Sequence, residues 1–252
     1  EGKAALVTGS SSGIGEAIAL RFAREGADVV VHYHREEEEA RAIAAQIEAL
    51  GRKSVALGAN VGVAAEAEGL VRDAHAALGR LDILVNNAGV EIREPFVEVS
   101  EQHYDLVLGV NLKGAFFAAQ AAARLMIAAG KGGRVVNVSS IHEDVAFLDY
   151  TTYATSKGGM RMFTRTVCQE LAPHGITVND IAPGAIATPI NKRTLGDGEL
   201  LHELQDVIPA GRLGEPNEVA SVAVFLASDE AAYVTGSTYY IDGGMARWNK
   251  GL

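Results

Sequence analysis

Several residue types that mark whole classes of proteins are scarce in this chain of 252 residues. It has a single cysteine, Cys168, so no intrachain disulfide can form and a reducing cytoplasm is the expected location. Cys168 lies in the periodic run "MRMFTRTVCQEL", where a small core residue is expected. Positive charge is also in deficit, with 22 Lys and Arg against 32 Asp and Glu and a net charge of −10. This deficit argues against nucleic acid as a partner.

Longer patterns are missing as well. No run looks apolar enough over the length of a membrane-spanning helix, and "EGKAALVTGS" leads directly into a strand-like run, so neither a membrane nor a signal peptide is expected. The 7 histidines are scattered, without an H-E-x-x-H pattern or clustered cysteine ligands, so no metal site is expected. The run "SSIHE" puts serine and histidine close together, but no G-x-S-x-G elbow surrounds these serines, which argues against a hydrolase.

The chain is instead 48% hydrophobic, with 28 glycines and only 6 prolines, a composition that supports a large core joined by tight turns. Short apolar or β-branched runs alternate with longer amphipathic ones, which predicts strands separated by helices. The predicted strands cover residues 4–8, 28–33, 53–58, 81–89, 134–140, 176–184 and 237–242, and the predicted helices cover 15–26, 36–51, 67–79, 104–126, 152–171 and 217–228. This order indicates one α/β domain over residues 1–252, with a doubly wound parallel sheet and a ligand crevice at its carboxyl edge.

One segment departs from this alternation. Residues 185–212 are polar and carry only a weak helical pattern near 200–207. An insertion of this length beside a crevice is expected to serve as a substrate lid, although a plain connection remains the alternative.

The run "TGSSSGIG" lies where the first strand gives way to the first helix. Its glycines allow a tight turn and close approach to a pyrophosphate, and the helix N-terminus offers free N–H groups. The spacing G-x-x-x-G-x-G is neither the usual dinucleotide pattern nor a Walker loop, and a merely structural turn is the alternative. The candidate cofactor residues here are Gly9, Ser11, Ser12, Gly13, Ile14 and Gly15.

The end of the second strand reads "VHYHRE", where dinucleotide folds often place an acid that binds the adenosine ribose. Here Tyr33, His34 and Arg35 take that place. Without the carboxylate, a 2′-phosphate meets no repulsion, and Arg35 could pair with it. NADP is therefore favoured, with NAD also possible. The alternative is that Arg35 pairs with the acidic run of residues 36–39.

The glycine loop, "NNAG" at 86–89, the paired serines 139 and 140, the pattern Tyr153-x-x-x-Lys157 and Pro183-Gly184 follow one another in an order that resembles the short-chain dehydrogenase/reductase family over nearly the whole chain. The resemblance implies a Rossmann-type sheet of about seven strands and a homotetramer. The runs "SSIHE", "YATSKGGM", "PGAIATPIN" and "GEPNEVA" are most similar to the bacterial glucose 1-dehydrogenases within it. The 3-oxoacyl-carrier-protein reductases share the general motifs but fewer of these runs.

The resemblance implies a catalytic set of Asn111, Ser140, Tyr153 and Lys157, acting on a sugar or another secondary alcohol or carbonyl compound. Tyr153 precedes Lys157 by four residues and follows Ser140 by thirteen, whereas Tyr150 has Ala154 at the matching position. Tyr153 would exchange a proton with the substrate, with its pKa lowered by the Lys157 ammonium. Ser140 would orient the substrate oxygen, and Asn111 would support a water relay. Tyr150 is left as a candidate wall of the pocket.

Further residues are assigned by the same resemblance. Tyr153, Glu91, His142 and Ser140 are the candidate substrate contacts, although Glu91 and His142 could equally belong to solvated loops. The remaining candidate cofactor contacts are Asn60, Val61, Asn87, Ala88, Gly89, Tyr153, Lys157, Pro183, Gly184, Ile186 and Thr188. Asn60 stands where many relatives have Asp, and the tail "MARWNKGL" differs from the glucose dehydrogenases. A dinucleotide-binding sensor without turnover is the alternative from another class, and the complete catalytic set argues against it.

Overall fold

The computed structural model describes residues 2–191 and 195–247. In these residues, parallel strands form a single sheet of seven in the order β3-β2-β1-β4-β5-β6-β7. The order reverses between β1 and β4, which is the switch point at which doubly wound sheets bind their ligands. The strands are β1 Ala4–Val7, β2 Asp28–Tyr33, β3 Ser54–Gly58, β4 Ile83–Asn86, β5 Gly133–Val138, β6 Ile176–Pro183 and β7 Thr238–Ile241.

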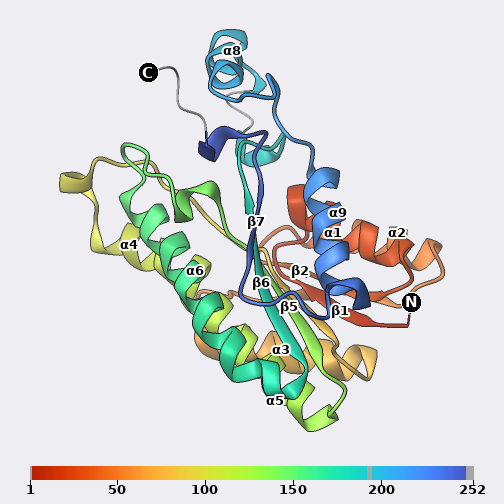
Figure 1. Ribbon diagram of the computed structural model, residues 1–252. Coiled ribbons are helices and arrows are strands. Elements are labelled where there is room, and N and C mark those ends of the chain that lie inside the picture. Colours follow the sequence, from red (N-terminus) through yellow and green to blue (C-terminus); the bar gives the residue numbers. More distant parts are fainter. Residues whose placement is uncertain (1, 192–194, 248–252) are drawn as a thin grey trace.

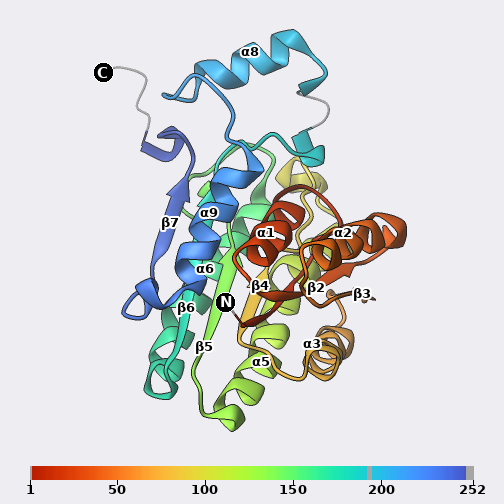
Figure 2. The ribbon, with the colours of Figure 1, turned by 90° about the vertical axis from the view of Figure 1, so that its right-hand side faces the viewer.

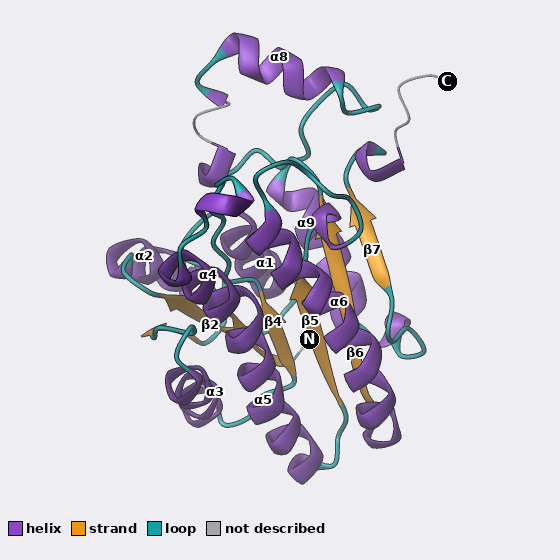
Figure 3. Cartoon of the chain, turned by 90° about the vertical axis from the view of Figure 1, so that its left-hand side faces the viewer, coloured by secondary structure: helices purple, strands orange, loops and turns teal. Residues whose placement is uncertain are grey.

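Helices cover both faces of this sheet, as Figures 1 and 3 show. One layer holds α1 Gly13–Arg24, α2 Glu37–Ala49 and α9 Pro216–Ala227, and the other holds α3 Ala64–Leu78, α5 Ala115–Ala129 and α6 Thr151–Leu171. Side chains that alternate along β1 separate the two cores. Ala5 and Val7 pack under the first layer and Leu6 under the second, because successive strand residues point to opposite faces. The predicted fold class is confirmed.

The prediction of a continuous helix over 104–126 is wrong in one respect. The structure has α4 Glu101–Leu108, then a π-helical turn, η2 Gly109–Gly114, and then α5. An added Cβ on Gly114 would collide with the main-chain oxygen of Val61, so the widened turn lies tightly against a neighbouring loop. A π-turn has no 3.6-residue sequence signature, and such turns are common at functional sites.

The run Glu101–Ala129 also corrects the expectation about apolar length. By length and composition it could cross a membrane, with a mean hydropathy of 1.4 in its most apolar window. However, 56% of that window is buried inside the protein, and α5 packs against α3, β4 and β5. Its apolar character is therefore explained by the second core layer.

The predicted lid contains α8 Gly198–Asp206, close to the weak helix expected at 200–207. Asp197 caps this helix by accepting hydrogen bonds from the N–H groups of Glu199 and Leu200. Figures 2 and 3 show α8 standing apart from the layers, at the end of the molecule toward which β5 and β7 point. The segment is therefore placed over the carboxyl edge, and its role as a lid stays a prediction.

Candidate active site

The glycine loop joins β1 to α1 at the carboxyl edge of the sheet. Gly9 and Gly13 have positive φ angles of 61° and 60°. A Cβ atom on Gly15 would collide with the main-chain oxygen of Gly9 and lie 2.5 Å from Asn87 Nδ2. Ser12 is the N-cap of α1, and among the described residues its side chain makes no capping hydrogen bond. This tight turn, with free N–H groups at the start of α1, fits the pyrophosphate of a dinucleotide. Ser11 and Ile14 lie half-buried in the same turn.

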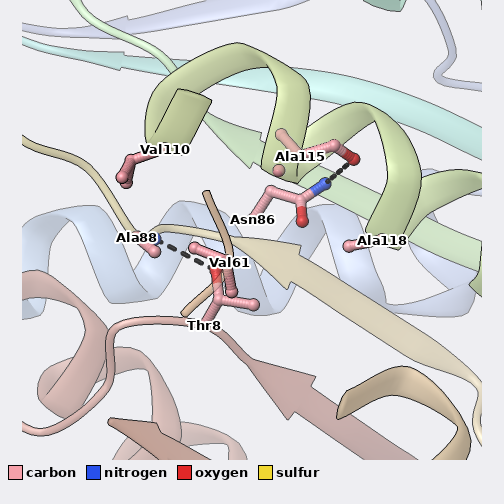
Figure 4. A pocket seen from close by; sticks show the side chains of 8 residues that line it. Thr8, Val61, Asn86, Ala88, Val110, Ala115 and Ala118 are labelled. Atoms are coloured by element: carbon pink, nitrogen blue, oxygen red, sulfur yellow. Dashed lines mark hydrogen bonds between the residues drawn. The ribbon is translucent and has the colours of Figure 1, made fainter. Parts of the chain in front are cut away.

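The segment after β4 supports the glycine loop. The main-chain N–H groups of Asn87 and Ala88 donate to Thr8 Oγ1 at 2.9 and 3.0 Å, and Figure 4 shows the bond from Ala88 at a small cavity. Asn87 Nδ2 donates to the main-chain oxygens of Thr8 and Gly9, both at 2.9 Å. Both amide hydrogens of Asn87 are thus used to hold the loop. Sequence reasoning, which assigned Asn87 as a cofactor contact, missed this role.

The three residues after the buried part of β2 lie at the surface. The Tyr33 ring packs on Gly58, where an added Cβ would lie 2.9 Å from the ring. His34 and Arg35 are exposed. The suggested pairing of the Arg35 side chain with the acidic run is not seen in the described part of the chain. The Arg35 main-chain N–H donates to the Glu36 carboxylate at 3.3 Å, and the Glu37 carboxylate pairs with Arg41. The Arg35 guanidinium is therefore available for a phosphate.

Asn60 and Val61 follow β3, as expected for residues near an adenine. Asn60 Oδ1 accepts a hydrogen bond from the Gly62 N–H at 3.0 Å, and the Asn60 N–H donates to Glu66 Oε2 at 2.7 Å. The amide oxygen of Asn60 therefore stabilises its own turn, and one lone pair remains for a ligand. Val61 is buried and lines the small cavity of Figure 4.

The segment after β6 returns toward the glycine loop. Pro183 ends β6, and an added Cβ on Gly184 would lie 2.9 Å from Asp242. Ile186 is buried in the core. Thr188 comes close to Gly13, where an added Cβ would lie 3.5 Å from it. The structure thus brings together two segments that were both predicted to contact the cofactor.

The catalytic candidates meet between the end of β5 and α6. Ser140 follows β5, and its Oγ accepts a hydrogen bond from the His142 N–H at 3.2 Å. Tyr153 and Lys157 lie one turn apart on α6, with Lys157 Nζ 5.5 Å from the centre of the Tyr153 ring. Lys157 Nζ donates to the main-chain oxygen of Val138 at 2.9 Å. The predicted grouping of these side chains is therefore present.

The expected lowering of the Tyr153 pKa by Lys157 does not match the structure. Burial raises the pKa of Tyr153 to about 12, while the Ser140 hydroxyl acts in the opposite direction by hydrogen bonding. Burial also lowers the pKa of Lys157 to about 8, although the carboxyl groups of Asp180, Glu143 and Glu91 favour its charged form. In the protein alone, desolvation of both groups outweighs their mutual attraction.

Asn111 lies in the π-turn and is fully buried, with 0% exposure. Its Oδ1 accepts from the Val90 N–H at 2.8 Å, and its Nδ2 donates to the Val90 oxygen and to Ser156 Oγ at 2.9 and 3.1 Å. An added Cβ on Gly89 would lie 3.5 Å from Asn111 Oδ1 and 3.9 Å from Lys157 Nζ. The Asn111 side chain therefore fixes the loop after β4 beside α6. A water relay remains a prediction.

An aromatic group forms the wall next to Tyr153. The His142 ring stacks on Tyr150 with centroids 5.3 Å apart, and lies edge-on to Phe147 at 4.5 Å and to Tyr153 at 5.6 Å. Burial lowers the pKa of His142, so its ring is neutral near pH 7. Glu91 is accessible to solvent, yet surrounding protein raises the pKa of its carboxyl group against the opposing effect of Lys157. Both predicted substrate residues thus face the catalytic group, as does Tyr150.

Sequence reasoning missed a buried polar cluster behind Lys157. Asp180 on β6 is fully buried, and its Oδ1 accepts hydrogen bonds from Thr164 Oγ1 and Asn137 Nδ2. Its Oδ2 has no partner among the described residues, and burial raises its pKa to about 7. The signal in the sequence was one acidic residue within the predicted buried strand that contains "ITVNDIAP". No group of His, Cys, Asp and Glu side chains within residues 2–191 and 195–247 is arranged to hold a metal ion.

A doubly wound sheet, a glycine loop at its switch point and a Ser–Tyr–Lys group beside that loop together define a dinucleotide-dependent oxidoreductase. A family model described as enoyl-(acyl carrier protein) reductase matches residues 9–246. The chain is an enzyme that belongs to the short-chain dehydrogenase/reductase family, as its sequence pattern predicted.

Similar proteins cover nearly the whole chain. The chain is 41% identical to 3β-hydroxysteroid dehydrogenase 1 of Eggerthella lenta, over 97% of this chain and 94% of that protein. It is also 41% identical to L-rhamnose 1-dehydrogenase (NAD(P)(+)) of a Sphingomonas species, over 97% and 96%. The crystal structure of a gluconate 5-dehydrogenase from Burkholderia cenocepacia, in complex with NADP and tartrate, is 35% identical with a TM-score of 0.93, and the match covers 99% of this chain and 97% of that one.

Proposed function

We propose that this enzyme transfers a hydride between NADP or NAD and a sugar or related polyol, as a glucose 1-dehydrogenase-like enzyme. The observation that carries the proposal is the group of Ser140, Tyr153 and Lys157 next to the segment after β4, which in turn holds the glycine loop. Glu91 and His142 lie close to the same group. A carboxyl group and a neutral imidazole can bind several hydroxyl groups at once. The named activities of two similar proteins, on rhamnose and gluconate, support this substrate class.

In the oxidation of an alcohol, Tyr153 takes the proton of the substrate hydroxyl, and in the reverse direction it donates one. Ser140 Oγ hydrogen-bonds the reacting oxygen and orients it. Lys157 stabilises the phenolate with its ammonium and holds the nicotinamide ribose. When bound, the nicotinamide supplies the hydride acceptor and, in its oxidised form, a positive charge that favours the phenolate. Asn111 keeps the loop after β4 in place for a water relay from Lys157.

The cofactor is proposed to lie from the glycine loop to Thr188, with NADP preferred over NAD. The support is the exposed Arg35 guanidinium just after β2. Tyr33 stands where dinucleotide folds often have an acid, so no carboxylate there would repel a 2′-phosphate. We also propose a cytoplasmic homotetramer. Apolar side chains exposed on α4, α5 and α6 would be covered in such an assembly; they include Tyr104, Leu106, Phe116 and Met162.

One panel of substrates tests the function. The purified enzyme is assayed with glucose, rhamnose, gluconate, simple secondary alcohols, a 3β-hydroxysteroid and β-ketoacyl thioesters, each with both cofactors, by the absorbance of the reduced nicotinamide. The proposal expects the highest kcat/KM with a sugar and NADP. Preference for a β-ketoacyl thioester would indicate an acyl-carrier-protein reductase instead. Cofactor binding without turnover of any alcohol or carbonyl compound would indicate a sensor.

A further inference from the structure

His32 is a buried histidine whose two ring nitrogens both make hydrogen bonds. It lies on β2, two residues before His34, and is 2% exposed. Its Nδ1 accepts from the Gly9 N–H at 2.8 Å, and its Nε2 lies 3.1 Å from the main-chain oxygen of Ala59. The ring therefore bridges the glycine loop after β1 and the segment after β3.

These partners fix the protonation state of the ring. A main-chain N–H can only donate and a carbonyl oxygen can only accept, so Nδ1 must be bare and Nε2 must carry the hydrogen. Burial lowers the pKa of His32 to about 4, while the hydrogen bond to the Ala59 oxygen and the nearby Glu36 carboxylate act in the opposite direction. The folded protein thus holds His32 as a neutral ring, and protonation of Nδ1 would break the hydrogen bond from the Gly9 N–H.

The main chain of His32 adds to this bridge. The Ser10 N–H donates to the His32 oxygen at 3.0 Å, and the His32 N–H donates to Ser10 Oγ at 2.9 Å. Ser10 Oγ in turn donates to the Val7 oxygen at 2.7 Å. On the other side of the loop, Gly9 lies tightly against Ala88. A Cβ added to Gly9 would lie 2.8 Å from the Ala88 Cα. The turn at Gly9 is therefore clamped between β2 and the segment after β4.

We propose that His32 is a positioning residue for the dinucleotide, because its ring holds the glycine loop at a fixed separation from the segment that begins at Ala59 and continues to Asn60. The first segment would hold the pyrophosphate and the second would contact the adenine, so their separation must match the two parts of one ligand. His32 itself touches neither part. This inference rests on the proposed binding of the cofactor at the glycine loop.

Two matched variants separate the two arms of the bridge. In His32→Asn, the amide oxygen lies close to the place of Nδ1 and can still accept from Gly9, while the arm to Ala59 is lost. In His32→Gln, the amide nitrogen lies close to the place of Nε2 and can still donate to Ala59, while the Gly9 N–H loses its acceptor. His32→Leu removes both arms, and His174→Gln, at an exposed histidine before β6, is the control.

Dissociation constants for NADPH are measured by the fluorescence of its nicotinamide, and those for 2′,5′-ADP by competition, well below the melting temperature of each variant. The free energy lost when a buried N–H has no partner corresponds to about a tenfold weaker binding of the cofactor. We expect His32→Gln and His32→Leu to raise the Kd for NADPH about tenfold or more. His32→Asn should raise it less, and His174→Gln should leave it near wild type. The KM for the cofactor should rise in parallel, while kcat at saturating cofactor stays close to wild type.

Wild-type affinity in both His32→Gln and His32→Leu would overturn the inference, as would a lowered melting temperature with no change in Kd. If His32→Leu fails to fold, the Asn and Gln variants still decide, because each keeps one hydrogen bond. The failure of the wild-type enzyme to bind any dinucleotide would instead overturn the proposed function. Nitrogen-15 spectra of the ring give a second readout, and a ring protonated at Nδ1 at pH 7 would also overturn the inference.

Discussion

Lys157 Nζ lies 5.5 Å from the centre of the Tyr153 ring and donates its hydrogen bond to the main chain of Val138, not to the phenol. The two groups are thus close enough to interact electrostatically, yet burial drives each toward its neutral form. This arrangement explains why Tyr153 cannot be a free base in the protein alone. The positive charge of an oxidised nicotinamide would therefore help to form the Tyr153 phenolate.

The first prediction concerns the choice between the two tyrosines. Tyr153→Phe removes the hydroxyl that is proposed to exchange a proton and should lower kcat by about 10²–10⁴-fold. Tyr150→Phe is the matched control, because Tyr150 contributes a ring stacked on His142 and should alter KM for the substrate more than kcat. Steady-state kinetics with saturating cofactor measure both. Turnover of Tyr153→Phe near wild type would contradict the mechanism.

The second prediction concerns the preference for NADP. Arg35→Ala removes an exposed guanidinium at the end of β2 and should lower kcat/KM for NADP, by about tenfold, with little change for NAD. Arg41→Ala removes a nearby guanidinium that already pairs with Glu37 and should leave the preference unchanged. The ratio of kcat/KM for the two cofactors is the measurement. A strong preference for NAD that does not respond to Arg35→Ala would refute this assignment.

The third prediction concerns the glycine loop. In Gly15→Ala the added methyl group would collide with the Gly9 oxygen and approach Asn87 Nδ2 at 2.5 Å. The loop must shift, so cofactor affinity should fall by at least tenfold and the melting temperature should drop. Gly69→Ala on α3 is the control, since its nearest neighbour is Arg72 Nη2 at 3.8 Å. That variant should be stabilised by up to about 1 kcal/mol with unchanged affinity.

The fourth prediction follows from Asp180. Its pKa is raised to about 7 in the folded protein, mainly by burial, above the value of 3.8 for an unfolded aspartate. A raised pKa means that the folded state binds the additional proton, so this contribution to stability is complete below pH 3.8 and is lost as the pH rises through about 7.

Asp180→Asn keeps an oxygen for Thr164 and Asn137 and cannot ionise. The free energy of unfolding of this variant, relative to wild type, should therefore increase between pH 4 and pH 8. Urea unfolding across this range measures the difference, with Asp197→Asn on the exposed helix cap as the control. A difference that does not change with pH would show that Asp180 is ionised throughout.

Local patterns carried much of the fold. The strand β2 was predicted with the bounds that the structure gives it, because "DVVVHY" is apolar, β-branched and enclosed by turns. The break of the long helix at Asn111 could not be predicted, because the π-turn lies against the loop after β3, a contact that no residue spacing marks. Within the site, motif order identified Tyr153 and Lys157 but not the direction of their pKa shifts, which depend on burial.

The sequence by itself determined the family and the alternation of strands and helices, and it supplied the candidate catalytic side chains, because these depend on residue type and on spacing along the chain. Tertiary structure alone decided which polar atoms are already engaged. It commits Asn87 to the glycine loop, ties His32 to Gly9 and Ala59, and buries Asp180 behind Lys157. Hydrogen-bond partners and desolvation come from residues far apart in the chain, so no local pattern contains them.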